Sequence, residues 1–397
     1  MGTVSLAEIA DVGRDRVRGG YSRHLFEPAD LELREWFVDR AIRTGLDVET
    51  DRNGNLWAWW GEPGPDAVVT GSHLDSVPGG GAFDGPLGVV SALDAVARLK
   101  TSGFVPSRPV AVVVFAEEEG SRFGVACLGS RLLTGAIDPD AARRLTDTHG
   151  VTLAEAASAA GLDPAHLGPD PEALSRMGVF VELHVEQGRG LVDLGAPVGL
   201  ASSILAHGRW RITVTGQGNH AGATTMAERR DPVVAAARTI VAVHDAALAS
   251  PGSRATVGRI AVVPGGTNVI ASSATAWLDA RAATNASTLA LVDDVRRRAE
   301  AAVADSGCTV TVVLESWSDL VEFDPALSAG LAGTLGGVPL LASGAGHDAG
   351  VLAARVPSAM LFVRNPTGVS HSPEEFAETA DCAAGVDALE RLLRSLL

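Results

Sequence analysis

Residues 109–120 read PVAVVVFAEEEG, an apolar and largely β-branched run that stops at three consecutive glutamates. A second apolar run, AVVT at residues 67–70, is followed at once by GSHLD at residues 71–75. Continuous apolar runs are typical of strands that are buried on both faces of a sheet. Because residues 87–100 have a helical pattern, the order strand–helix–strand predicts a mostly parallel sheet. Polar residues that follow such strands lie at the sheet edge where ligands bind in α/β folds.

The α/β pattern extends back toward the start of the chain. Residues 30–44 are predicted to form an amphipathic helix, with Asp30 as its N-cap and Gly45 as its stop. The apolar face of this helix would hold Leu33, Trp36, Phe37 and Ala41.

The pattern changes at about residue 208. Strands are expected at 209–215, 256–263, 274–281 and 309–315, and helices at 232–248 and 288–304. This β-α-β-β-α-β order is the pattern of a ferredoxin-like domain, and α/β texture returns after about residue 322. We therefore expect an α/β fold of two domains. Residues 1–207 and 321–397 would form a catalytic domain with a mostly parallel sheet, and residues 208–320 an inserted ferredoxin-like α+β domain.

Composition excludes several classes of protein. The 397 residues include 32 Lys and Arg against 48 Asp and Glu, a formal charge of −16, which argues against a nucleic-acid partner. A hydrophobic share of 46% excludes a largely disordered chain. The three cysteines are far apart and form no CxxC, and no apolar run approaches the length of a membrane span. We expect a soluble cytoplasmic protein without a membrane or nucleic-acid partner.

Histidines and acids gather in clusters that follow the predicted strands. The clusters contain His73 and Asp75, Asp84 in a glycine-rich turn, Glu117 to Glu119, His184 in ELHVEQ, and His371 near the end of the chain. Imidazole and carboxylate groups without cysteine suit a catalytic divalent site. Two metals about 3.5–4 Å apart need a bridging carboxylate, an arrangement that suits hydrolysis by activated water.

Each cluster taken alone has a simpler interpretation. A single histidine after a strand is more often structural than a ligand. The three glutamates fit a solvated turn, and the glycines around Asp84 fit an ordinary turn. The joint occurrence of several clusters at strand ends favours the metal site over these independent explanations.

Several motifs in a fixed order carry a resemblance to a known family. They are GSHLDSVPGGGAFDGPLGV, EEEGSRFG, ELHVEQG, GNHAGATTM, GGTNVI, LDAR and SHSPEE, between about residues 70 and 375. The chain resembles the M20 metallopeptidase-like amidohydrolases, in the branch of N-carbamoyl-L-amino-acid hydrolases, β-ureidopropionases and allantoate amidohydrolases. The resemblance implies hydrolysis of the terminal C–N bond of a linear ureido acid, with release of ammonia and carbon dioxide. The substrate it favours is an N-carbamoyl-L-amino acid. Allantoate stays open as the substrate, and so does an aminoacylase or peptidase activity of the wider family.

The resemblance also implies a metal centre with two divalent ions, drawn from zinc, manganese, cobalt and nickel. His73 and His184 would bind one ion, Glu119 and His371 the other, and Asp84 would bridge them. Glu118 would be the general base that takes a proton from the attacking water. Counting back from Gly120 assigns these glutamates and leaves Glu117 without a role; strand alternation, which puts Glu117 and Glu119 on one side, is compatible with this but does not decide it.

Further roles follow for the substrate and for a second subunit. His220 would stabilise the oxyanion, reaching in from the partner subunit of a homodimer. Gln187, Asn268 and Arg281 would hold a small anionic ureido substrate, with Arg281 pairing with its carboxylate. His347 would line the site without ligating, with a structural role and a substrate contact equally open. Residues 208–320 would form the lid and dimerisation domain.

Two other classes of protein are less well supported. GQGNHA at 216–221 and GAGHDA at 344–349 fit a dinucleotide fingerprint. That fold needs an acid about 20 residues further on, and the chain has none around residue 236 or at 364–369. A binding protein that had lost its catalysis would lack the base or a ligand, and neither is missing here.

Overall fold

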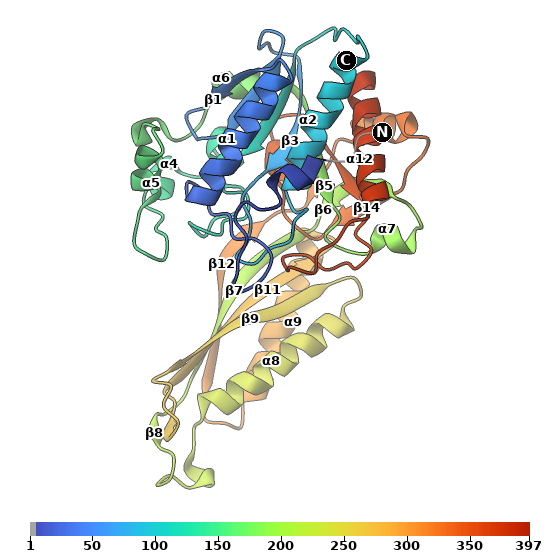
Figure 1. Ribbon diagram of the computed structural model, residues 1–397. Helices are drawn as coiled ribbons and strands as arrows, with labels where there is room; N and C mark the ends of the chain where they lie inside the picture. The colour runs from blue at the N-terminus through green and yellow to red at the C-terminus, as the bar shows by residue number, and fades with distance from the viewer. Residues whose placement is uncertain (1–4) are drawn as a thin grey trace. The chain divides into compact units, whose positions relative to one another are not determined.

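The computed structural model describes residues 5–397. These residues form two compact units (Figure 1). One unit contains the chain up to Ile204 together with Glu322–Leu397, and the other contains Leu205–Val321. The predicted insertion, residues 208–320, falls inside the second unit.

A nine-stranded sheet forms the centre of the first unit, in the order β1-β2-β4-β3-β5-β15-β6-β13, with β14 paired to β6. Its four central strands, β4, β3, β5 and β15, run parallel to one another. β2 pairs antiparallel with β4, and β6 pairs antiparallel with β15. The sheet is therefore mixed, with the predicted parallel pairing at its centre. The strands are β1 (Asp47–Thr50), β2 (Leu56–Trp60), β3 (Ala67–His73), β4 (Val110–Phe115), β5 (Met177–Val185), β6 (Val198–Ile204), β13 (Val321–Glu322), β14 (Leu340–Ser343) and β15 (Ser358–Val363).

Every residue of β3 and β4 is buried, as the continuous apolar runs predict. Alternate residues of β4, such as Val110 and Val112, join a core with α2 (Pro86–Thr101) and α12 (Thr379–Leu396). Each buried valine contributes roughly 1.5–3 kcal/mol. The other described helices of this unit are η1 (Ser5–Ile9), α1 (Pro28–Arg43), α3 (Leu128–Thr134), α4 (Pro139–Arg143), α5 (Leu153–Ala159), η2 (Pro164–His166), α6 (Pro171–Ser175), α7 (Gly190–Asp193), α10 (Pro325–Thr334) and α11 (Asp348–Leu352).

The start of α1 differs from the prediction. The helix begins at Pro28 with Glu27 as N-cap, so the assignment of Asp30 as N-cap is wrong. Proline suits the first helical turn because its missing N–H has no partner there in any case. Asp30 is instead buried in that turn, where it accepts hydrogen bonds from Phe26 N and Arg34 Nε. The predicted apolar face is confirmed: Leu33, Phe37 and Ala41 are fully buried and Trp36 is partly buried.

The second unit has a four-stranded antiparallel sheet in the order β12-β7-β11-β9. One face of β7 and β11 is buried with the two long helices, while the residues between are more exposed. The main elements follow one another as β7 (Ala206–Thr215), α8 (Pro232–Ala249), β9 (Arg254–Val263), β11 (Ser273–Ala282), α9 (Asn285–Val303) and β12 (Thr309–Ser318). A short antiparallel pair joins β8 (Asn219–His220) to β10 (Val269–Ile270), and η3 (Met226–Glu228) follows β8 in the chain.

Within the described residues, α8 is the one helix that is long and apolar enough to cross a membrane. A third of its residues are buried, and it packs against α9 and the sheet of the second unit. A core helix of a globular domain has the same length and composition.

Candidate metal centre

Three neighbouring strands bring most of the predicted ligands to one edge of the first sheet. His73 is the last residue of β3 and pairs in register with Phe115, the last residue of β4. The glutamates follow β4 after Ala116, and His184 is the penultimate residue of β5, which flanks β3 on its other side. Parallel pairing therefore places residues that are far apart in sequence at the same carboxyl edge.

Asp84 lies at the centre of this group. Its Oδ1 is 3.5 Å from His73 Nε2 and 3.1 Å from His184 Nε2. Its Oδ2 is 3.5 Å from His371 Nε2, which in turn is 3.3 Å from Glu119 Oε2. Two sets of three ligand atoms result, each set lying within 4.8 Å and both sharing Asp84. One set holds the two buried histidines, and the other holds Glu119 and His371.

The donor atoms of this group fit a divalent cation. His73 Nδ1 lies 3.0 Å from the carbonyl oxygen of Asp75, and His184 Nδ1 lies 2.9 Å from that of Val185. A hydrogen bond from Nδ1–H to a carbonyl leaves the Nε2 lone pair as the ligand, the usual arrangement of metal-binding histidines. Both Nε2 atoms are buried and have no hydrogen-bond partner among the described residues.

The charges of the group also favour a cation. Burial alone lowers the pKa of His184, but Asp84 outweighs it and raises that pKa to about 9. Burial also lowers the pKa of His73, but the neighbouring Glu118, Asp75 and Asp84 outweigh it and raise that pKa well above the usual 6.5. Without a metal the carboxylates thus hold protons on imidazoles that would otherwise be ligands. Metal and protons compete for such groups.

The three glutamates occupy three different environments. Glu117 has a left-handed backbone, with a φ of 53°, and its Oε1 accepts hydrogen bonds from Arg122 N and Phe123 N. This turn breaks the strand alternation that was compatible with Glu117 and Glu119 on one side. Glu119 contacts His371, while Glu118 Oε2 lies 3.7 Å from His73 Nε2. Burial raises the pKa of Glu118 to about 7.

Two carboxylates that sequence reasoning left without a role organise the centre. Asp75 accepts hydrogen bonds from the backbone N–H groups of Glu118 and Glu119. Glu375 accepts from the backbone N–H groups of Phe83 and Asp84, at 3.0 Å each. Both residues stand in the quoted motifs, Asp75 in GSHLD and Glu375 in SHSPEE. Their distance in sequence from the groups that they hold gave no local signal of this role.

Gln187 and His347 lie beside the centre. Gln187 Nε2 donates to Asp84 Oδ2 at 2.6 Å and is 3.2 Å from His371 Nε2. His347 is buried, and its ring centroid is 4.5 Å from that of His184. Burial lowers the pKa of His347 well below 6.5, so it is neutral at physiological pH. Its Nε2 is 3.2 Å from Ser343 Oγ.

His220, Asn268 and Arg281 belong to the second unit. His220 is exposed in β8, and its Nδ1 accepts hydrogen bonds from Gly222 N and Ala223 N. The proton of a neutral His220 ring is therefore on Nε2, which makes that atom a donor. The carbonyl oxygen of Asn268 accepts from Ala221 N, so the two predicted residues lie close together. Arg281, near the end of β11, pairs with Asp279 through two hydrogen bonds of 2.7 and 2.9 Å.

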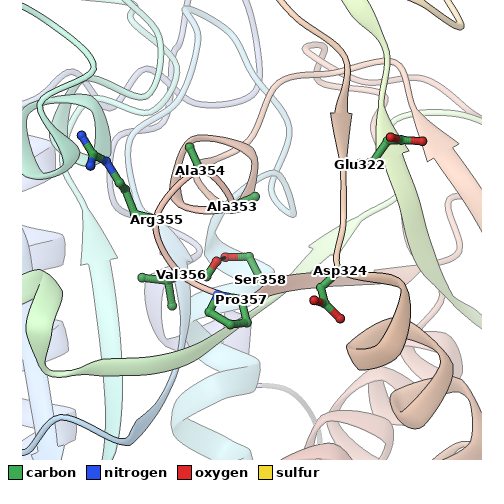
Figure 2. A pocket seen from close by; sticks show the side chains of 8 residues that line it. All are labelled: Glu322, Asp324, Ala353, Ala354, Arg355, Val356, Pro357 and Ser358. Atoms are coloured by element: carbon green, nitrogen blue, oxygen red, sulfur yellow. Dashed lines mark hydrogen bonds between the residues drawn. The ribbon is translucent and has the colours of Figure 1, made fainter.

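Two features outside the centre bear on other functions. The motif at 216–221 leads into β8 rather than into a helix, which a dinucleotide-binding turn requires. A cavity of about 380 Å³ lies at the amino end of β15, opposite the edge that carries the ligands. Figure 2 shows Glu322 and Asp324 on one side of this cavity and Arg355 on the other. The motif contains His220, whereas the cavity is lined by no predicted catalytic residue.

Comparison with known proteins agrees with this geometry. Residues 69–395 match the model of peptidase family M20/M25/M40. The chain belongs to this family. It is 38% identical to an N-carbamoyl-L-amino acid amidohydrolase of Geobacillus stearothermophilus, over 97% of this chain and 95% of the relative. It is 34% identical to an allantoate amidohydrolase of Escherichia coli strain K12, over 95% and 93%.

A solved structure supports the same assignment. An amidase of the hydantoinase/carbamoylase family from Burkholderia vietnamiensis superposes with a TM-score of 0.87 at 32% identity, covering 99% of this chain and 95% of that one. The M20 family member described here is thus a hydrolase with a mixed α/β fold and His/Asp/Glu clusters able to bind metal.

Proposed function

We propose that this M20 family enzyme hydrolyses the terminal C–N bond of a linear ureido acid. The proposed substrate is an N-carbamoyl-L-amino acid. The products are ammonia, carbon dioxide and the free amine. The observation that carries the proposal is the convergence of His73, Asp84, Glu119, His184 and His371, from five separate segments, on two ligand sets that share one carboxylate. The names of the two relatives above supply the substrate class.

We assign two divalent ions to these five residues, drawn from zinc, manganese, cobalt and nickel. His73 and His184 would hold one ion, Glu119 and His371 the other, and Asp84 both. Bound there, the metals would polarise the carbamoyl carbonyl and lower the pKa of the attacking water. The mixed imidazole and carboxylate donors accept all four metals.

Glu118 is the proposed general base. It is 6% exposed and is adjacent to the ligand Glu119, so it faces the centre without being one of the five ligands. A carboxyl with a pKa of about 7 takes a proton from water and returns it to the leaving nitrogen near neutral pH. The backbone bond from Glu118 N to Asp75 supports its position.

The proposed homodimer rests on distances inside the second unit. His220 and Asn268 precede β11, whereas Arg281 is near its end, so roughly 26 Å of strand at ~3.3 Å per residue separates them. A ureido acid is far too short to contact both ends. We therefore propose that one protomer supplies Arg281 and its partner supplies His220 together with Asn268. The second unit would then act as lid and dimerisation domain.

Within one site, the proposed substrate contacts divide by charge. Arg281 would pair with the carboxylate, Gln187 would donate to the ureido oxygen, and His347 would contact the substrate or support His184. His220 would donate from Nε2 to the developing oxyanion. The three cysteines are free, which fits work in the reducing cytoplasm.

The substrate assignment is tested by ammonia release from N-carbamoyl-L-methionine, N-carbamoyl-β-alanine and allantoate. The protein is first stripped with a chelator and then reloaded with each metal in turn. We expect the highest kcat/KM with N-carbamoyl-L-methionine. Turnover of allantoate alone would move the enzyme to the allantoate branch, and turnover of N-acyl or peptide substrates alone would contradict a ureido substrate.

The shared site is tested by mixing two inactive variants, Glu118→Gln and His220→Ala, under conditions of subunit exchange. In a symmetric dimer half of the mixed population is hybrid, and each hybrid has one intact site, so about a quarter of wild-type activity should return. Absence of any recovery despite proven exchange would show that His220 acts within its own protomer.

A further inference from the structure

A second cavity in the first unit has features of a ligand site. Its volume is about 340 Å³, within the roughly 300–1,000 Å³ of small-molecule sites. Its wall is mainly apolar and aromatic, and includes Leu6, Ala7, Ile9, Ala10, Tyr21, Phe83 and Phe376. Among residues 5–397, Arg23 is the one charged residue that lines it. None of the proposed catalytic residues or metal ligands forms part of this wall.

Arg23 is a buried cation with neutral partners. It is 1% exposed, and its Nε and Nη2 donate to the carbonyl oxygens of Val12 and Ile9, each at 3.0 Å. Its guanidinium lies 4.1 Å from the centre of the Tyr21 ring. Nη1 is buried and has no hydrogen-bond partner in the described part of the chain. Buried arginines are normally paired with an anion, because burial of an uncompensated charge is costly.

The electrostatics of Arg23 agree with a missing counter-charge. Burial lowers its pKa to about 10, and none of the charges that act on it is a carboxylate. The group is still protonated at neutral pH. An anion next to it would offset the cost of burial and would accept a charge-assisted hydrogen bond.

We propose that this cavity binds a small organic monoanion with a hydrocarbon tail, such as a medium-chain carboxylate. The carboxylate would pair with Arg23, and the chain would lie among the apolar residues of η1, Phe83 and Phe376. The combination of one buried cation with a mainly apolar wall selects against inorganic anions, which would leave the apolar surface unfilled, and against neutral amphiphiles, which would leave the charge unpaired.

The position of the cavity connects it to the metal centre. Phe83 directly precedes Asp84, and Phe376 directly follows Glu375. The two rings contact each other edge to face, with their centroids 6.2 Å apart. Glu375 accepts hydrogen bonds from the backbone N–H groups of Phe83 and Asp84. A ligand that contacts both rings therefore acts on the two loops that carry Asp84 and His371. The proposed binding is independent of the proposed function.

Octanoate is the probe, with octanol as the neutral control of equal chain length and acetate as the control for charge alone. Binding is measured by calorimetry and by thermal shift on the full-length metal-loaded protein. We expect octanoate to bind at least about tenfold more tightly than octanol or acetate, the effect of one charge-assisted hydrogen bond plus the buried chain. No octanoate binding at millimolar concentration, or equal binding of octanol, would overturn the proposal.

Three variants locate the site. Arg23→Met should weaken octanoate binding about tenfold or more. Arg14→Met is the matched control, since Arg14 also lies over the Tyr21 ring but is exposed and paired with Asp11. Ala10→Phe reduces the volume of the cavity while Arg23 itself is retained, and it should abolish binding, so the proposal stays testable if Arg23→Met does not fold.

The substrate site is excluded by a separate variant. Arg281→Ala should leave octanoate binding unchanged. Loss of binding in Arg281→Ala with retention in Ala10→Phe would place octanoate in the substrate site and would overturn the cavity proposal while supporting the proposed function. Retention in both Arg23→Met and Ala10→Phe would also overturn it.

Discussion

Glu117, Glu118 and Glu119 are consecutive residues of the same type, but the surroundings of their carboxylates differ. Glu117 is turned away by its left-handed backbone to bind Arg122 N and Phe123 N. Glu119 is directed to His371, and Glu118 lies between them beside His73. At this scale the sequence predicted which residue types would gather. It could not predict the turn at Glu117, because the backbone bonds that hold it are made by residues further along the chain.

The proposed base is tested by Glu118→Gln. We expect kcat to fall by roughly 10²–10⁴, the usual contribution of a general acid–base group, with metal content near that of wild type. Glu117→Gln is the matched control: it keeps the oxygen that binds Arg122 N and Phe123 N, and it should keep activity close to wild type. Loss of metal in Glu118→Gln would mean that Glu118, not Glu119, is the ligand.

The proposed substrate-binding role of Arg281 is tested by Arg281→Ala. Because the lost group is proposed to pair with the carboxylate, KM for N-carbamoyl-L-amino acids should rise by about tenfold or more while kcat changes less. The corresponding carboxamide, which has no charge to pair, should show nearly the same KM with both enzymes. An unchanged KM for the carboxylate substrate would refute the assignment.

At the scale of elements, the strands were more predictable than the loops that join them. The apolar runs of β3 and β4 directly predict strands that are buried on both faces of the sheet. The loops that carry Asp84 and His371 have no such pattern, and their positions depend on Glu375, which contacts Asp84 N across 291 residues of sequence. Gly85 adds a local requirement: it has a φ of 80°, and a Cβ there would lie 2.4 Å from the His73 ring. His371 itself is held in the left-handed region, with a φ of 56°.

The connection between these loops is tested by Glu375→Ala. Removal of the acceptor leaves the N–H groups of Phe83 and Asp84 without their partner and should weaken metal affinity by about tenfold or more. Glu374→Ala is the matched control, because Glu374 is exposed and bonds only locally to Ser372. Metal titrations that give the same affinity for wild type and Glu375→Ala would contradict this role.

For the whole molecule, the sequence predicted two domains and the order of elements in the second, but not how protonation couples to the metal centre. Glu118 keeps a proton to about pH 7 in the folded chain but only to about 4.5 when unfolded, because burial raises its pKa. His184, where Asp84 outweighs burial, keeps its proton to about pH 9 in the folded chain against 6.5 when unfolded. Both differences lower the stability of the metal-free protein as pH rises from about 5 to 9.

Thermal unfolding at pH 5.5 and pH 8.5 checks this coupling. The metal-free protein should unfold at a temperature several degrees lower at pH 8.5, and added divalent metal should restore stability most at that pH, because it replaces the protons that are lost. A metal-free protein that is more stable at pH 8.5 would show that the acids and imidazoles of the centre are not coupled as described.

The metal stoichiometry of the stripped and reloaded protein, followed together with ureido hydrolysis, tests the whole account most directly. With added metal, activity should rise until two ions are bound per chain, and Asp84→Ala, which lacks the shared carboxylate, should retain less than one ion and no activity. Full activity in the metal-free protein, or two ions bound by Asp84→Ala, would contradict the assignment of His73, Asp84, Glu119, His184 and His371 as the catalytic metal centre.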